Sequence, residues 1–360
     1  MKHLLITQPY LPKYRVPLFE AIGAKLVANG VSTTVAIGTP AGQQASRGDS
    51  EQASWSVPMR AWKIKLGQRT VEWRRVPKSI GRPDVIVSEL QATNTYAWAA
   101  VARRIPLVLW GHGKSYVDAP SALGDKLEWA LGRHARMLMT YTEGGRDYLV
   151  DRGRFAADRV VAIGNSTDTV TIRNGYLRAR GIESNNDAEI GPRALYVGGL
   201  DASKRIDFLL EAAVAASELD PRFELVIAGT GALSGLVDRA VATGSPISRI
   251  EDVRGAALGM LGATTDALWM PGRVGLAAVD ALAMGLPVHT TNFPYHAPEL
   301  ELLKSGEYSK LTDTPSGFAA ESLGLISRSL PRHARVLRED VPTIDSVASN
   351  FVSTVLKALE

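Results

Sequence analysis

The sequence predicts an α/β fold with two doubly wound parallel sheets, and three observations lead to this prediction. Short apolar strands alternate with helical patterns along most of the 360 residues, as expected of parallel strands covered by helices on both faces. A chain of this length favours two domains. A polar stretch at residues 182–192, rich in Asn, Asp and Glu, interrupts the alternation and has the composition of a linker.

Each element follows from its apolar pattern. Apolar runs predict strands in the first half at residues 3–7, 33–37, 85–87, 107–110, 137–141 and 160–163, and in the second half at 194–197, 224–228, 248–250, 267–270 and 288–290. Apolar residues at helical spacing predict helices between them, for example at 16–28, 205–217 and 275–284. Residues 344–359 are helical and amphipathic, so we expect this segment to pack back on the first half. The predicted domains are 1–180 together with 340–360, and 190–339.

Composition excludes several classes of protein. The chain has no cysteine, which rules out a disulfide scaffold and a cysteine-based zinc site. No apolar stretch approaches the roughly 18 residues that span a bilayer. The first apolar run is too short for a signal peptide, so we expect a cytoplasmic protein. No Asp-x-Asp metal motif is present, and we expect metal independence.

Positive charge is concentrated in one stretch, although the net charge is only +4. This stretch contains one acid, Glu72, and the basic residues Arg60, Lys63, Lys65, Arg69, Arg74, Arg75, Lys78 and Arg82. Trp55, Trp62 and Trp73 lie in or beside it. Basic residues with interfacial tryptophans suit an anionic membrane surface, whereas a solvated basic face is the simpler interpretation. No nucleic-acid motif accompanies the stretch, so we expect no nucleic-acid partner.

Ligands of doubly wound sheets bind beyond the carboxyl ends of the strands, so we searched the loops there. Gly198 and Gly199 end one predicted strand, and a helix then begins near Lys204 and Arg205. A helix N-terminus offers free amides and a positive dipole end to anions. The two basic residues beside it predict a clamp for a diphosphate.

Two further loops carry glycines at strand ends. Gly229-x-Gly231 resembles a dinucleotide fingerprint, with Glu251 about where a ribose-binding acid falls. The third glycine is misplaced, and close packing explains the pair equally well. His112 follows another strand on a backbone freed by flanking glycines, including Gly113, which indicates a functional histidine.

The fourth loop is PGRVGLAAVDALAMGLPV, at residues 271–288. Gly272 ends the strand, and Gly275, Leu276 and Ala277 open a helix whose amides could bind an anion. Asp280 falls in the first turns of this helix, on a surface that could face a ribose.

The order of these loops resembles the GT-B glycosyltransferases, and among them the large retaining family 4, also called group 1. The resemblance covers nearly the whole chain. VGGLDASKR matches the family's Gly-Arg-Leu…Lys-Gly segment, with Lys204 on the lysine that binds the donor diphosphate. Gly229 and Gly231 match the family's Gly-x-Gly, and residues 271–288 match its Pro-Ser-x-x-Glu-Gly-Phe-Gly-Leu…Pro-Val block. His112 matches the histidine at the reacting sugar.

The chain departs from this family at several positions. Gly272 replaces the first glutamate of the E-x₇-E pair, Asp280 shortens the second, and Gly199 replaces the arginine of Gly-Arg-Leu. Tyr14 and Arg15 stand in place of the first Gly-Gly loop. The block is similar to a subgroup with Pro-Gly-x-Val-Gly-Leu. Backbone from Gly272 and Val274 onward would then hold the donor sugar, helped by His296 or Glu299.

The resemblance implies two Rossmann-like domains facing a central cleft, with acceptor binding in the first and donor binding in the second. It implies transfer of a sugar, with retention, from a UDP- or GDP-sugar to a lipid-linked or glycan acceptor, without a cofactor. Such an enzyme could sit peripherally on the inner face of the cell membrane. Three alternatives remain: a nucleotide-sugar 2-epimerase, an NAD-dependent oxidoreductase using Gly229, and a non-catalytic nucleotide-sugar-binding protein.

Overall fold

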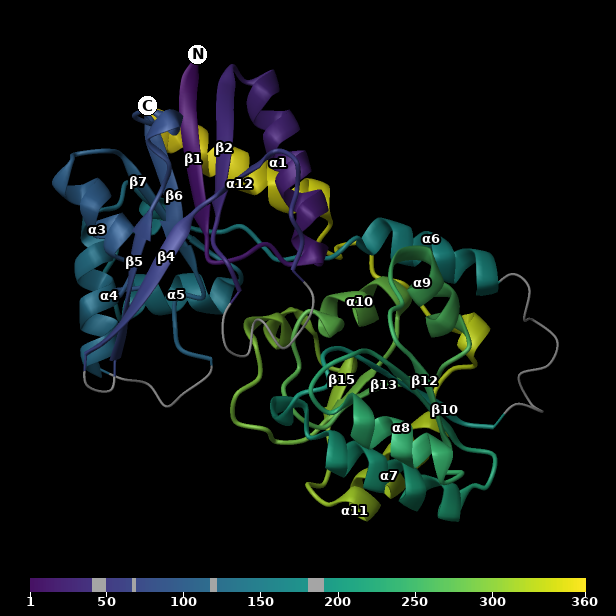
Figure 1. Ribbon diagram of the computed structural model, residues 1–360. Helices are drawn as coiled ribbons and strands as arrows, with labels where there is room; N and C mark the ends of the chain where they lie inside the picture. The colour runs from purple at the N-terminus through teal and green to yellow at the C-terminus, as the bar shows by residue number, and fades with distance from the viewer. Residues whose placement is uncertain (41–49, 67–68, 117–121, 181–190) are drawn as a thin grey trace. The chain divides into compact units, whose positions relative to one another are not determined.

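The computed structural model describes residues 1–40, 50–66, 69–116, 122–180 and 191–360, with backbone alone for the described residues among 63–72 and for residue 122. Two compact units result (Figure 1). The first consists of residues 1–40 and 50–165 with Ile344–Glu360, and the second of Ser166–Thr343. Most of the predicted linker lies outside the described residues. None of the described helices has the length and hydrophobicity needed to cross a bilayer.

The first unit is a parallel sheet in the order β3-β2-β1-β6-β7-β8-β9. Its strands are β1 (Lys2–Gln8), β2 (Val31–Ile37), β3 (Ser56–Pro58), β6 (Val85–Glu89), β7 (Leu107–Gly111), β8 (Met137–Thr140) and β9 (Val160–Ala162). The predicted strands are confirmed within one or two residues, and β3 is additional. The central strands are buried on both faces, since helices cover both.

Helices of the first unit are α1 (Val16–Ala28), α3 (Thr95–Ala102), α4 (Ala122–His134), α5 (Glu143–Asp151) and α12 (Ile344–Leu359). The returning helix α12 packs on α1, as Figure 1 shows. Val347, Phe351 and Val355 fall on its buried stripe and join the core formed by β1 and α1. The prediction that residues 344–359 return to the first domain is therefore confirmed.

A two-stranded antiparallel hairpin, β4 (Arg60–Leu66) and β5 (Arg69–Arg75), was missed by the sequence analysis. It holds most of the basic stretch. Arg74 does not belong to an exposed basic face, because it is 4% exposed and forms an ion pair of 2.5 Å with Glu89. Trp55 is half-buried and packs against Phe19. The side chains of Lys63, Lys65, Arg69 and Glu72 lie outside the described residues.

The second unit is a parallel sheet in the order β12-β11-β10-β13-β14-β15. Its strands are β10 (Arg193–Val197), β11 (Glu224–Ala228), β12 (Ile247–Ile250), β13 (Ala267–Met270), β14 (Val288–Thr290) and β15 (Tyr308–Lys310), of which β15 was not predicted. Its helices are α6 (Thr169–Arg180), α7 (Ile206–Leu219), α8 (Ser234–Ala242), α9 (Gly255–Ala263), α10 (Ala277–Met284) and α11 (Pro315–Ile326).

Helix α6 packs in the second unit, although the sequence analysis assigned residues up to 180 to the first. It contacts α9 more extensively than any other two elements contact each other. Gly175 of α6 and Gly259 of α9 each lie against the other helix's backbone, and a Cβ at either position would clash there. This close approach moves the boundary between the units to Asn165 and Ser166.

Candidate functional site

In the second unit, the loops after β10 and β13 are bonded to each other. The Arg273 amide donates to the Ser203 carbonyl (2.9 Å), and Lys204 Nζ donates to the Arg273 carbonyl (2.6 Å). A Cβ at Gly272 would clash with the Ser203 carbonyl oxygen and lie 2.6 Å from the Lys204 carbonyl carbon. Gly272, which the sequence analysis matched to the family's first glutamate, therefore has no room for a side chain, because backbone fills that space.

The loop after β11 joins this assembly. The Leu200 amide donates to the Thr230 carbonyl (2.9 Å), and a Cβ at Gly229 would clash with the Gly198 carbonyl. Arg249, on β12, donates to Ser234 Oγ (3.1 Å) and forms an ion pair with Asp238. These glycines therefore serve close packing of the loops, as the alternative interpretation held.

Glu251, the acid about where a dinucleotide fingerprint places a ribose-binding residue, directly follows β12. Its side chain is 80% exposed and lies 3.9 Å from Arg249. Arg249 also donates to Ser234 and pairs with Asp238, so these contacts join β12 to the segment that follows β11.

Helix α10 begins with amides that have no partner among the described residues. Leu276 precedes the helix and makes no side-chain cap, and the first bonded amides are those of Ala278 and Val279. The N–H groups of Gly275, Leu276 and Ala277 are therefore available to a ligand. Lys204, held on the carbonyl of Arg273, adds a positive charge to the same loop.

His296 holds this loop in place. Its Nδ1 accepts from the Val274 amide (3.2 Å) and its Nε2 lies 3.3 Å from the Thr291 carbonyl, to which it donates in that tautomer. Burial lowers the pKa of His296 to about 4, so the ring is neutral and suited to this double role. With both nitrogens engaged, His296 positions the loop. Glu299 is 4% exposed in the short helix Pro298–Leu302, which packs against α10.

Asp280 lies on α10 and is 8% exposed. One carboxylate oxygen accepts from Thr167 Oγ1 at 2.6 Å. Burial raises the pKa of Asp280 to about 6, while this hydrogen bond opposes the shift. The other oxygen has no hydrogen bond among the described residues, so it remains able to accept one from a ligand.

Arg205 does not form the second half of a diphosphate clamp in this conformation. Its backbone is left-handed, with φ 54°, and its guanidinium is engaged by other side chains of the unit. It forms an ion pair with Asp313, donates to Thr291 Oγ1 (3.1 Å) and stacks over Phe208. Lys204 is thus the basic residue of this segment that faces the loop after β13.

In the first unit, Arg15 lies among aromatic rings at the carboxyl end of the sheet. Its guanidinium is 4.8 Å from the centroid of Trp110 and donates to Tyr141 Oη at 2.8 Å. Tyr14 lies beside it. Arg15 Nε is buried without a partner, and no carboxylate of the described residues forms an ion pair with this guanidinium.

His112 belongs to the same cluster. Its ring lies 5.0 Å from Tyr141 and 5.7 Å from Tyr116, centroid to centroid. Gly113 is left-handed, with φ 79°, and a Cβ there would lie 2.5 Å from the Gly145 carbonyl on α5. Tyr141 therefore joins His112 to Arg15, although the sequence analysis did not single it out. Its place at the end of the predicted strand 137–141 was the available signal.

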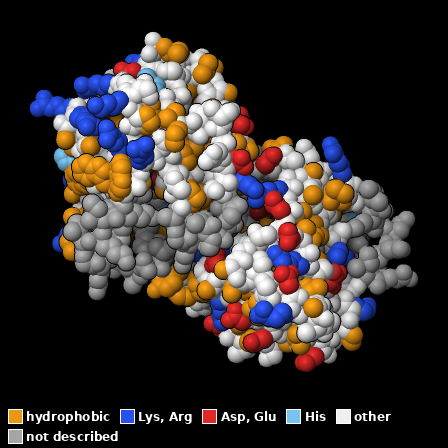
Figure 2. Space-filling view, in the orientation of Figure 1, with side chains coloured by type: hydrophobic (Ala, Val, Ile, Leu, Met, Phe, Trp, Pro, Cys, Tyr) orange, Lys and Arg blue, Asp and Glu red, His pale blue; other side chains and the backbone are white. Residues whose placement is uncertain are grey.

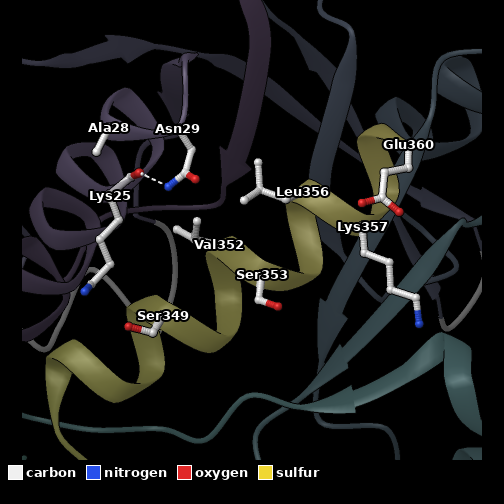
Figure 3. A pocket seen from close by; sticks show the side chains of 9 residues that line it. All are labelled: Lys25, Ala28, Asn29, Ser349, Val352, Ser353, Leu356, Lys357 and Glu360. Carbon is white, nitrogen blue, oxygen red and sulfur yellow. Dashed lines mark hydrogen bonds between the residues drawn. The ribbon is translucent and has the colours of Figure 1, made fainter.

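A hollow elsewhere in the first unit takes no part in this. It has a volume of about 670 Å³ and is lined by residues of α1 and α12, among them Lys25, Asn29, Ser353 and Lys357. Figure 3 shows these side chains on the two helices. Lys2, at the start of β1, donates to the carbonyl of Leu359 near the end of α12. The hollow thus lies toward the amino ends of the strands, on the opposite edge from the loops described above.

Two family models match the chain. Residues 18–166 match the glycosyl transferase 4-like domain, and residues 191–328 match the glycosyl transferases of group 1. Together the two matches include most of the chain. No curated protein is significantly similar to it in sequence.

Solved structures of the same fold include both epimerases and transferases. The UDP-GlcNAc 2-epimerase from Neisseria meningitidis has a TM-score of 0.64 at 14% identity, over 99% of this chain and 100% of that one. Anabaena Alr3699/HepE in complex with UDP has 0.59 at 15%, over 99% and 97%. The pneumococcal O-GlcNAc transferase GtfA, in complex with UDP and GlcNAc, has 0.65 at 10%, over 100% and 99%.

The two Rossmann-like parallel sheets with their helices match these structures, which confirms the predicted GT-B fold. The chain belongs to the GT-B glycosyltransferases of group 1. It is therefore a transferase of the nucleotide-sugar type, and the family predicted from the sequence is confirmed at this level.

Proposed function

We propose that the protein transfers a sugar, with retained anomeric configuration, from a UDP- or GDP-sugar to a lipid-linked or glycan acceptor. The bond between the sugar C1 and the diphosphate oxygen breaks, and a bond from C1 to an acceptor oxygen forms on the same face. The acceptor's hydroxyl proton goes to the departing diphosphate. His112 contacts the reacting sugar, and no metal or cofactor takes part.

The observation that supports this most is the start of α10. The free amides of Gly275, Leu276 and Ala277 and the ammonium group of Lys204 belong to one assembly of loops. The partial positive charges of the amides and the full charge of the lysine would stabilise a departing diphosphate. Preorganised donors aimed at developing charge usually contribute more to such catalysis than any other single effect. Asp280, with a free carboxylate oxygen, accepts from the donor ribose.

Gly272 does not argue for an inactive protein. Since backbone of Ser203 and Lys204 fills the space beside it, the loop has a different shape from one that carries a glutamate there. In this arrangement the amides from Gly275 onward replace the carboxylate as ligands of the donor sugar. His296 holds the neighbouring Val274 amide, and Glu299 lies in the short helix that packs against α10.

The acceptor carries a negative charge in this proposal. Arg15 brings a guanidinium to the carboxyl end of the first sheet without a carboxylate partner among the described residues. A guanidinium without an ion pair favours an anionic ligand, with which it forms charge-assisted hydrogen bonds. A lipid-linked diphosphate or an acidic glycan supplies that anion.

The test begins with a thermal-shift screen of nucleotide sugars, because a ligand that binds the folded state raises the unfolding midpoint. The stabilising donor is then incubated with candidate acceptors, and nuclear magnetic resonance reads the anomeric configuration of the product. An inverted product contradicts retention. A donor isomerised at C2 without any acceptor identifies a 2-epimerase, the activity named for one similarly folded structure. Binding without either product identifies a non-catalytic protein.

A further inference from the structure

The β4–β5 hairpin presents exposed side chains on one face, as far as the structure describes them. In its antiparallel register Trp62 lies opposite Trp73, and Arg60 opposite Arg75. Residues directly opposite each other, and residues two apart along a strand, share a face. Arg60, Trp62, Trp73 and Arg75 therefore form one surface, called here the tryptophan face.

On the opposite face of the hairpin, Arg74 packs on the domain. Arg74, one residue from both Trp73 and Arg75, is 4% exposed and pairs with Glu89 of β6. Helix α3 contacts β5 on this side, and Asn94, which caps α3, also donates to Glu89 (3.2 Å). The alternation along β5 thus leaves the tryptophan face outward.

The tryptophan face combines exposed indoles with unneutralised charge. Trp62 is 46% exposed and Trp73 is 57% exposed. Arg60 and Arg75 are exposed beside them, as are Lys78 and Arg82, which follow on the chain. None of these four cations forms an ion pair with a residue that the structure describes. Figure 2 shows basic side chains gathered beside a hydrophobic patch on this unit.

We propose that the tryptophan face docks the protein on an anionic lipid bilayer. Indole rings prefer the headgroup level, where an apolar body and a polar edge are both satisfied, and basic residues beside them are attracted to anionic headgroups. On this face the arginine pair lies next to the tryptophan pair, so charged and aromatic groups can meet the same surface. This inference goes beyond sugar transfer and holds whichever donor the protein uses.

The test measures co-sedimentation of the whole protein with vesicles. We expect binding to phosphatidylcholine vesicles that contain about one third phosphatidylglycerol, and none to phosphatidylcholine alone. Raising the salt from about 0.1 M to 1 M should release the protein, since the Debye length falls from about 10 Å to about 3 Å. Equal binding to both kinds of vesicle, or none to either, overturns the proposal.

Variants locate the surface. Arg60→Glu with Arg75→Glu should weaken binding at least about thirtyfold, from about fivefold for each cation removed. Arg239→Glu with Arg328→Glu, two exposed arginines of the second unit, makes the same change in net charge and should leave binding unchanged. Thermal unfolding shows that each variant is folded. If both pairs weaken binding equally, net charge and not the tryptophan face is responsible, and the proposal is wrong.

The indoles have their own readout. Vesicles with brominated acyl chains should quench the tryptophan fluorescence of the parent protein, and should quench Trp62→Phe with Trp73→Phe much less. Unchanged quenching overturns the assignment of these rings. Single-stranded nucleic acid also combines stacking with charge. If it binds the tryptophan face while anionic vesicles do not, the surface takes a polynucleotide and the membrane proposal is wrong.

Discussion

Gly272→Glu is the substitution that separates two interpretations of this loop. If the glycine were a decayed catalytic position, restoring the family's glutamate would raise activity. The structure predicts the opposite, because a Cβ at this position would clash with the Ser203 carbonyl and lie 2.6 Å from the carbonyl carbon of Lys204. Both neighbours are backbone, so relief requires the loops after β10 and β13 to separate.

The magnitude follows from the cost of overpacking. Such substitutions destabilise by about 1–3 kcal/mol, which for a domain of this size lowers the unfolding midpoint by about 2–12 °C. Parting the loops also breaks the bonds from Arg273 to Ser203 and from Lys204 to Arg273. A displacement of about 1 Å at a reacting centre costs on the order of 10²-fold in rate.

The assay pairs differential scanning fluorimetry with donor turnover, and Gly275→Ala is the control. Gly275 is in the same loop, but a Cβ there meets only Ala297 Cβ at 3.9 Å, so the fold should tolerate it. We expect Gly272→Ala and Gly272→Glu to lower the unfolding midpoint, and Gly275→Ala to leave it within a degree or so. A Gly272→Glu protein with a parent-like midpoint, or with higher turnover, would refute the steric argument.

The remaining predictions concern the charged groups. Lys204→Ala should lower kcat/KM by an amount equivalent to about 1–3 kcal/mol of transition-state stabilisation, with Lys126→Ala as the control, and an unchanged kcat/KM would remove Lys204 from the site. Asp280→Asn should weaken binding of the free nucleoside diphosphate in calorimetry. Burial raises the pKa of Asp280 to about 6, above its value in the unfolded chain. The stability that the protonated carboxyl contributes is therefore complete below the unfolded pKa and is lost as the pH rises through 6. Between about pH 4 and pH 7 the unfolding midpoint of the parent should fall relative to that of Asp280→Asn, and parallel pH profiles would contradict this. Arg15→Met should raise KM for an anionic acceptor and spare nucleotide binding, and the reverse pattern would place Arg15 on the donor. A chelator should leave turnover unchanged, because Lys204 and backbone amides carry the diphosphate charge; loss of activity restored by a divalent cation would show that a metal takes part.

The basic stretch shows how an element that is missed changes an interpretation. Reading along the chain, Arg74 and Arg75 are alike. Once β5 forms, alternation buries Arg74 on Glu89 and exposes Arg75 beside Trp73. The hairpin could not be predicted from apolar runs, because basic residues interrupt the apolar pattern of both its strands. A pairing of aromatic residues across a short turn would have indicated it.

The sequence by itself determined the strand–helix alternation, the returning helix α12 and the order of the glycine-bearing loops, and through these the GT-B fold and the group 1 family. These features depend on local apolar periodicity and on residue spacing, which the chain carries in linear form. His112, Lys204 and Asp280 could be named for the same reason, since each lies just after a strand or at the start of a helix.

Tertiary structure alone decided how those residues are used. Arg205 pairs with Asp313, more than a hundred residues away in sequence. His296 accepts a hydrogen bond from the amide of Val274, 22 residues earlier. The clash at Gly272 depends on a neighbour nearly seventy residues earlier. Contacts between distant segments arise only when strands stack in a particular order and bring their carboxyl ends to one edge. For that reason spacing could name the loops but could not show which side chains remain free to meet a ligand.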